Sequence, residues 1–219
     1  MDNLQLSDNT HGSSASTDDG SEVEAIKIYG LSNYYFYSKP APPLKNQTLE
    51  ERVCCLKTRY DVYGMRTSVE AVILVELSNT PHLLLLQVRN STYKLPGGRL
   101  RPGESDVEGL KRKLMNKLSV QCDGIFPDWE VGECLGRWWR VGFETLLLPY
   151  LPPNVRSPKE CRKIFLVKLP ERQKFTVPKT HKLLVVPLSQ IHENHEIYGP
   201  VISGVPQLLS KFPVEIVNR

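Results

Sequence analysis

The sequence lacks an apolar run approaching the length of about 18 residues that a membrane-spanning helix needs. Its first stretch, MDNLQLSDNTHGSSASTDDGSE, has neither the basic flank nor the apolar centre of a secretory signal peptide. These absences predict a soluble, intracellular protein.

The sequence also lacks any CxxC pair, and no histidine is spaced to complete a zinc site with its five cysteines. An odd number of unpaired cysteines favours reduced, partly buried thiols over metal ligands. We therefore expect no metal and no cofactor. The cysteines are Cys54, Cys55, Cys122, Cys134 and Cys161.

Basic residues are missing from the first 24 positions, which carry six acids. The remainder therefore holds 18 of the 24 acids against all 28 basic residues, a net charge of +10. Such a body suits a polyanionic partner, although a solvated lysine surface is the alternative. The polar stretch 1–23 is predicted to be a disordered acidic tail, because it has too little apolar surface to offset the entropy of ordering. Residues 24–219 are predicted to form one domain.

The pattern before the centre of the chain predicts an N-terminal arm and helix, residues 24–66, packed on this domain. Glu24–Lys39 is rich in aromatic and β-branched residues, which favours an extended arm or edge strand. Thr48 with Glu51 forms a capping box that predicts a helix of roughly three turns. Its apolar stripe is Leu49, Val53, Leu56 and Tyr60.

The centre and second half predict an α/β protein with a mixed sheet. A capping box at Ser105 and Glu108 predicts a helix over Asp106–Leu118, with an apolar face of Val107, Leu110, Leu114 and Leu118. A short helix is expected from Ser203, carrying Leu208 and Leu209. The expected strands are too apolar for a one-sided sheet, so both faces should be covered. They are Ser68–Leu77, His82–Val88, Trp129–Arg140, Cys161–Leu169 and Lys182–Ile191.

Two polar or aromatic features leave alternatives open. Glu70 stands among apolar residues, where a carboxylate is costly unless it is paired. It is either a strand-end salt bridge or a ligand contact. Trp138-Trp139-Arg140 is either a stacking platform for bases or one core residue beside one surface residue.

A loop and the helix after it resemble the Nudix box, G-x5-E-x7-R-E-U-x-E-E-x-G-U, where U is apolar. Gly98, Glu104 and Arg112 match its opening, but the three positions that should be Glu are Lys113, Asn116 and Lys117. In a working box those carboxylates hold the Mg²⁺ that binds a pyrophosphate. Repulsion between unit charges about 4 Å apart is worth about 4 kcal/mol near a protein surface, so this site should not hold Mg²⁺.

The wider chain resembles the small, Nudix-like subunit family of pre-mRNA cleavage factor Im, from about residue 25 to the end. The matching stretches are YGLSNYYF, GMRTSVEAV, KLPGGRLRPGE, DVEGLKRKL, GRWWR, PKECRKIFLVKL and YGPVISGVPQLLSKF. The resemblance implies a Nudix-like α/β/α sandwich that does not hydrolyse nucleotides. It also implies a nuclear homodimer that binds single-stranded UGUA RNA. Its expected partners are a larger subunit with an RNA-recognition motif and other 3′-end processing and polyadenylation factors.

The family pattern also implies which residues bind the RNA and which meet phosphates. Arg and Glu can read opposite edges of a base, while backbone amides distinguish uracil from cytosine. The implied RNA-binding residues are Arg52, Glu70, Thr92, Tyr93, Lys94, Leu95, Tyr198 and Gly199. Lys45, Arg52, Arg140 and Tyr150 are implied to meet the phosphates of a dinucleoside polyphosphate.

The chain departs from the family pattern at two positions. Thr92 stands where animal members place a stacking aromatic, and Leu44 stands where they place an acid. Without that stacking partner, binding is weaker by about 1–3 kcal/mol unless the neighbouring Tyr93 substitutes. Three hypotheses follow: an RNA-binding module without catalysis, a dimeric scaffold with weak RNA binding, or a residual nucleotide hydrolase using Glu104 and Glu108.

Overall fold

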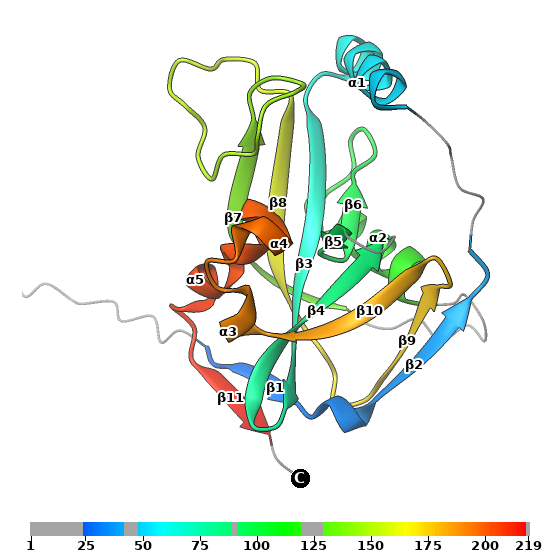
Figure 1. The fold of residues 1–219 in the computed structure, drawn as a ribbon, viewed down its shortest axis with the longest axis vertical. Helices are drawn as coiled ribbons and strands as arrows, with labels where there is room; N and C mark the ends of the chain where they lie inside the picture. Colours follow the sequence, from blue (N-terminus) through cyan, green and yellow to red (C-terminus); the bar gives the residue numbers. More distant parts are fainter. Residues whose placement is uncertain (1–23, 42–47, 89–91, 120–128, 218–219) are drawn as a thin grey trace, which may run out of the picture.

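The computed structural model describes residues 24–41, 48–88, 92–119 and 129–217 (Figure 1). The predicted tail 1–23 and the positions of Leu44 and Lys45 lie outside the described residues. Among those residues, no helix is both long and apolar enough to cross a membrane.

The fold is built on a mixed sheet with the strand order β10-β4-β3-β8-β7. β3 and β8 run parallel, while the other neighbours in this order are antiparallel. Two short strands extend it, β5 (Thr92–Lys94) beside β4 and β6 (Gly97–Arg99) beside β3. The main strands are β3 (Arg66–Leu77), β4 (Thr80–Val88), β7 (Glu130–Arg140), β8 (Glu160–Lys168) and β10 (His181–Pro187).

Four of the five predicted strands agree with the structure to within a few residues. The prediction for Lys182–Ile191 is wrong at its end, because the chain turns after Pro187 into the short helix α3 (Leu188–Ile191). β9 (Gln173–Pro178) was not predicted. Its sequence, QKFTVP, has only Phe175 and Val177 as large apolar residues, which is too short a pattern to predict a strand.

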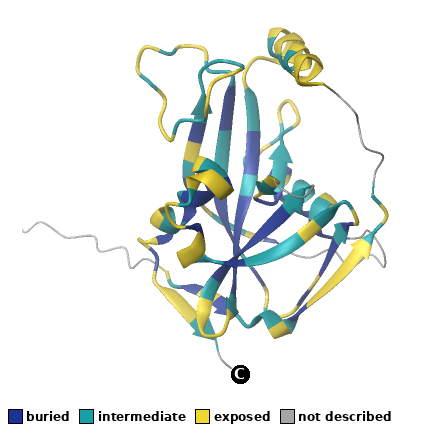
Figure 2. Ribbon diagram, viewed as in Figure 1, coloured by how far each residue is buried: buried dark blue, intermediate teal, exposed yellow. Residues whose placement is uncertain are grey.

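Both faces of the sheet are covered, which confirms the predicted α/β/α sandwich (Figures 1 and 2). Along β3, Val72 and Leu74 belong to one apolar cluster and Ala71 and Ile73 to the other, as alternation in a strand requires. The first cluster packs against α4 (His195–Ser203) and α5 (Val205–Leu209), and the second against α2 (Asp106–Leu118).

The α2 helix has the predicted bounds. The Ser105 hydroxyl accepts from the amide of Glu108 at 3.3 Å, and Leu110, Leu114 and Leu118 are fully buried. Val107 was predicted in this buried face, but it is 43% exposed. Gly109 faces the body instead. A β-carbon there would come within 2.0 Å of Leu100, so the loop before the helix fills this space.

The predicted extended arm is present as two strands joined by the 3-10 turn η1 (Leu31–Asn33). β1 (Ile26–Tyr29) pairs in parallel with β11 (Val214–Val217). β2 (Tyr34–Lys39) pairs in parallel with β9. The arm is thus held by strands from the far end of the chain.

The helix α1 (Leu49–Tyr63) begins with the predicted capping box, since the side chains of Thr48 and Glu51 each accept from the other's amide. At 15 residues it is longer than the predicted three turns. The prediction that its apolar stripe packs on the body is wrong at Leu49, which is 70% exposed, and α1 has no buried residue. The helix stands apart from the sheet in Figure 1. It contacts the body through Tyr60, whose ring packs against Phe143 and the Lys159 ammonium.

The predicted C-terminal helix corresponds to α5, which begins two residues after Ser203, whereas α4 was not predicted. Ser203 ends α4, and α5 carries Leu208 and Leu209. α4 is kinked at Gly199, whose φ of 75° favours glycine.

Candidate functional site

A cavity of about 200 Å³ opens where β5 faces α4, and we call it the tyrosine cavity. It gathers six of the eight predicted RNA-binding residues from three separate parts of the chain. They are Glu70, Tyr93, Lys94, Leu95, Tyr198 and Gly199, and Arg140 lines the cavity with them.

Two tyrosine rings form one side of this cavity. Tyr93 comes from β5 and Tyr198 from α4, and their ring centroids are 5.0 Å apart with planes inclined by 54°. Burial, with the neighbouring Tyr93, raises the pKa of Tyr198 above its ordinary value. The tyrosines therefore offer an aromatic surface together with a hydrogen-bond donor.

The backbone beside Tyr198 is held in an unusual conformation. Gly199 has a φ of 75°, and the Ser203 hydroxyl donates to its carbonyl at 2.7 Å. His195 in turn contacts this hydroxyl through Nδ1. Because α4 bends at this point, Tyr198 and Gly199 both face the tyrosine cavity.

Glu70 supplies the one carboxylate that lines the described tyrosine cavity. It is the fifth residue of β3, so it lies inside the strand and not at the strand end that one of the two alternatives required. It is nevertheless paired, with Arg162 Nη1 3.6 Å from its Oε1. Burial raises the pKa of Glu70 above its ordinary value, and the Arg162 charge offsets only part of this rise. Its position in the strand removes water from the Glu70 carboxylate, but the carboxylate still lines the cavity, where a ligand can reach it.

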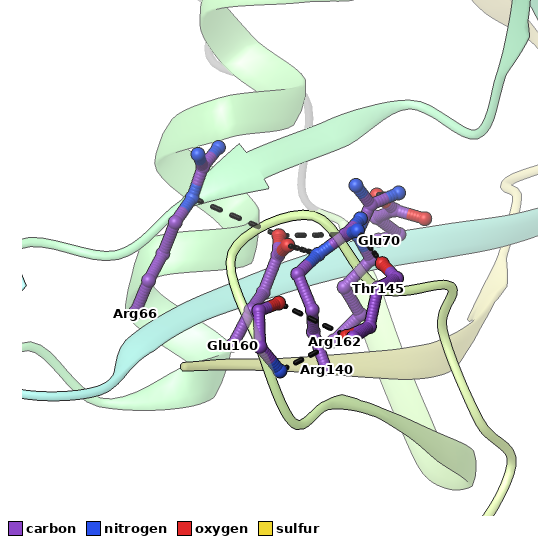
Figure 3. A network of polar contacts seen from close by, with 7 residues as sticks. Arg66, Glu70, Arg140, Thr145, Glu160 and Arg162 are labelled. Atoms are coloured by element: carbon purple, nitrogen blue, oxygen red, sulfur yellow. Dashed lines mark hydrogen bonds and ion pairs between the residues drawn. The ribbon is translucent and has the colours of Figure 1, made fainter. Parts of the chain in front are cut away.

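A second carboxylate, Glu160, organises three arginines beside the cavity (Figure 3). It accepts from Nε of Arg140 at 3.0 Å and from Nε of Arg162 at 3.1 Å, and the Arg66 Nε lies 3.7 Å away. Burial works to raise the pKa of Glu160, but these arginines outweigh it and hold that pKa below its ordinary value. Arg140 also donates to the carbonyl of Thr145. Its predicted phosphate contact would therefore compete with existing partners.

The remaining predicted site residues lie outside the tyrosine cavity. Arg52 is exposed on α1 and Thr92 is exposed in β5. Tyr150 is 60% exposed on the long connection before β8. Burial lowers the pKa of Lys94, and the charges of Arg162, Lys117 and Arg52 lower it further, so Arg52 acts on the cavity from a distance.

Sequence reasoning missed Arg162 and the α4 residues 200–202, which also line the cavity. The signal for Arg162 was present, because Glu160 and Arg162 are two residues apart and share one face of a strand. Of the two alternatives for the tryptophans, the burial of Trp138 favours packing. Trp138 is buried in the core and Trp139 is half-buried beside it, and neither is among the residues lining the described tyrosine cavity.

A second cavity of about 310 Å³, the lysine cavity, lies between α2, β3 and β10. It shares Glu70, Lys94, Leu95 and Arg162 with the first. Lys113 and Lys117 line it at two of the positions where a Nudix box has glutamates. The Lys113 side chain packs over Gly98, where an added β-carbon would lie 3.3 Å from the Cδ atom of Lys113.

Glu104, the one acid that matches the Nudix box, forms hydrogen bonds within the protein. Glu104 accepts from Arg112 through both oxygens at 2.5 and 2.6 Å, and from the amide of Arg101 at 2.8 Å. The paired Arg112 and the Arg101 amide lower the pKa of Glu104 to about 2. Glu108 accepts from the Ser105 hydroxyl. Among the described residues, no group of three His, Cys, Asp or Glu side chains could hold a metal ion.

Comparison with known proteins identifies the family. A Nudix family model, described as nucleotide hydrolase, matches residues 24–212. The chain is 56% identical to pre-mRNA cleavage factor Im 25 kDa subunit 1 of Arabidopsis thaliana, over 100% of this chain and 96% of that protein. The chain belongs to the cleavage factor Im 25 kDa subunit family, within the Nudix group.

Two further relatives support this assignment to the cleavage factor Im family. Subunit 2 of the same plant is 47% identical over 89% of this chain and 98% of that protein. Cleavage and polyadenylation specificity factor subunit 5 of Dictyostelium discoideum is 39% identical over 90% of this chain and 98% of that protein. The family assignment thus rests on essentially the whole length of each relative.

Proposed function

We propose that this cleavage factor Im family member binds single-stranded RNA containing a UGUA element during pre-mRNA 3′-end cleavage and polyadenylation, without hydrolysing nucleotides. The observation that carries the proposal is the tyrosine cavity. Residues from β3, β5 and α4 meet there, and six of them are positions that the family resemblance assigns to RNA.

The cavity has the chemistry to read an unpaired base. Tyr93 and Tyr198 offer aromatic surface on which a base can stack, which suits single strands whose bases are unstacked. The Glu70 carboxylate accepts hydrogen bonds from base N–H groups. Tyr93 is the neighbour that takes over the stacking role left by Thr92.

The absence of hydrolysis follows from the altered Nudix box. Lys113, Asn116 and Lys117 replace the acids that hold Mg²⁺, and Glu104 is bound to Arg112. Without a metal to polarise the pyrophosphate, attack by water is not accelerated. Incubation of the protein with a diadenosine polyphosphate and Mg²⁺ should release no nucleotide. Release that disappears in Glu104→Gln would overturn this part of the proposal.

The names of the relatives also suggest the partners and the cellular location of this protein. We infer that the chain acts in the nucleus as a homodimer within cleavage factor Im. A larger subunit with an RNA-recognition motif and other polyadenylation factors are its expected partners. Residues 1–23 are proposed to remain an acidic tail outside the RNA-binding domain.

A fluorescence titration tests the RNA-binding function. A short UGUA-containing RNA should bind more tightly than a scrambled one at physiological salt. Tyr93→Ala should weaken UGUA binding by about 1–3 kcal/mol, because the variant removes a stacking surface. Tyr35→Ala is the matched control, since Tyr35 is exposed on β2 and lies outside the tyrosine cavity. Equal affinity for the two RNAs would refute the proposal.

A further inference from the structure

The lysine cavity has a strongly uneven charge. Five basic side chains face the two carboxylates Glu70 and Glu160, which leaves a formal net charge of +3 before His181 is counted. The basic residues are Arg66, Lys94, Lys113, Lys117 and Arg162. In a partly buried cavity such charges repel one another more strongly than in water.

The ion pairs of the two carboxylates in the described residues are with arginines and not with lysines. Glu160 already binds Arg66, Arg140 and Arg162, and Glu70 pairs with Arg162. Among the described residues, neither Lys94, Lys113 nor Lys117 forms an ion pair. The lysines therefore form the uncompensated part of the cavity wall.

Lys117 lies at the centre of this repulsion. Its charge acts on Lys94, Lys113 and His181, which all line the cavity, and on Lys39. Burial lowers the pKa of Lys113, and Arg112 and Lys117 lower it further. A bound anion would remove this repulsion and restore the ordinary preference of the lysines for their protonated form.

We propose that the lysine cavity is a phosphate-binding site, formed by reversing the charge of a Nudix metal site. The site takes the phosphate directly, through Lys94, Lys113 and Lys117, where a Nudix hydrolase would hold a cation that binds the phosphate. A volume of about 310 Å³ leaves room for the anion and its remaining water.

The position of the lysine cavity identifies the first candidate source of the phosphate. Both cavities share Lys94 and Arg162. A nucleotide with its base in the tyrosine cavity would therefore carry its backbone phosphate past Lys94, a step that rests on the proposed RNA-binding function. A free polyphosphate or nucleotide is the other source.

Calorimetric titration with inorganic pyrophosphate at low salt tests the site without any RNA. The wild type should bind pyrophosphate, and the double variant Lys113→Gln/Lys117→Gln should bind it at least about tenfold more weakly, because it removes two charge-assisted hydrogen bonds. Lys27→Gln/Lys174→Gln removes the same charge from exposed positions on β1 and β9 and should bind as the wild type does. Thermal unfolding of each variant checks that it is folded.

The salt dependence of UGUA RNA binding distinguishes the two sources. If the phosphate belongs to the RNA, the slope of log affinity against log salt should fall by about 0.7 for each lysine–phosphate ion pair that Lys113→Gln/Lys117→Gln removes. An unchanged slope, together with the absence of pyrophosphate binding in this variant, supports the site and assigns it to a free phosphate compound.

Two results would separate failure of this inference from failure of the proposed function. Pyrophosphate that fails to bind the wild type, or that binds Lys113→Gln/Lys117→Gln equally well, overturns the phosphate site. Lysine-dependent pyrophosphate binding without any preference for UGUA RNA upholds the phosphate site and refutes the proposed RNA specificity.

Discussion

At the scale of single residues, Glu160 holds three arginines together beside the tyrosine cavity. Its carboxylate is buried and contacts three arginines, two of which line the lysine cavity with it. Removing the negative charge would leave these arginines to repel one another and would also release Arg140 and Arg162 from fixed positions.

Glu160→Gln should therefore destabilise the protein by about 3 kcal/mol at pH 7, since breaking a buried ion pair from one side leaves uncompensated charge. Urea denaturation of both proteins measures the difference. Glu215→Gln, at an exposed position on β11, should change stability by less than about 0.5 kcal/mol and serves as the control. Equal destabilisation of the two variants would argue against the arginine network.

The pH dependence of this stabilisation has a defined sign. The folded-state pKa of Glu160 lies below its ordinary value, so the stabilisation is fully present above the unfolded pKa near 4.5. It is lost as the pH falls through the folded pKa. The difference in unfolding free energy between wild type and Glu160→Gln should shrink as the pH is lowered below 4.5.

Residue identities alone predicted the site only in part. The resemblance supplied Glu70, Tyr93 and Tyr198, which the fold brings together. It could not show that Arg52 lies on a helix that stands apart from the body, since helix pattern fixes a face and not its distance from the sheet. Arg162 was missed because a basic residue within a strand is usually a solvated one.

At the scale of secondary structure, the loop before α2 is held by the close approach of β6 to β3. Gly97 has a φ of 149°, and a β-carbon there would lie 2.2 Å from the carbonyl oxygen of Val69. This approach places Gly97 and Gly98 in the wall of the lysine cavity. It also fixes the start of the loop that carries Glu104.

Gly97→Ala should cost more than about 3 kcal/mol, because an unfavourable φ and a backbone overlap act together. Gly103→Ala separates the two effects. Gly103 has a φ of 75° but no atom within 4 Å of an added β-carbon. Its substitution should cost only about 1–2 kcal/mol of backbone strain. Thermal denaturation ranks the two variants, and a smaller destabilisation by Gly97→Ala would contradict this geometry.

Helices and strands with a regular spacing of apolar residues could be predicted from the sequence, and irregular ones could not. α2 has a capping serine and three fully buried leucines at a spacing of four, so its bounds followed from the sequence. α4 was missed because Gly199 and Pro200 interrupt its pattern, and these residues create the kink that turns Tyr198 to the cavity. The irregularity that defeated the prediction is part of the site.

At the scale of the whole molecule, the charge of the lysine cavity decides which ions stabilise the fold. A ligand that binds the folded state raises the unfolding free energy in proportion to RT ln(1 + [L]/Kd). Cations should be repelled from the lysine cavity, and phosphates should be attracted to it.

Addition of Mg²⁺ should therefore leave the Tm of the wild type unchanged when ionic strength is held constant. In Lys113→Glu/Asn116→Glu/Lys117→Glu the same addition should raise Tm, because carboxylates again face the cavity. Differential scanning calorimetry of both proteins provides the measurement. A Tm increase confined to the wild type would show that a cation site exists elsewhere and that the charge argument fails.

The pairing of β1 with β11 also determines the order in which the domain can be completed during synthesis. Ile26 lies opposite Val214, so the first strand of the described chain has its partner 188 residues later. A nascent chain exposes the apolar Ile26 and Ile28 for the whole of that interval, and contacts of such long range form slowly. We therefore expect the emerging arm to need protection from aggregation until translation supplies its partner strand.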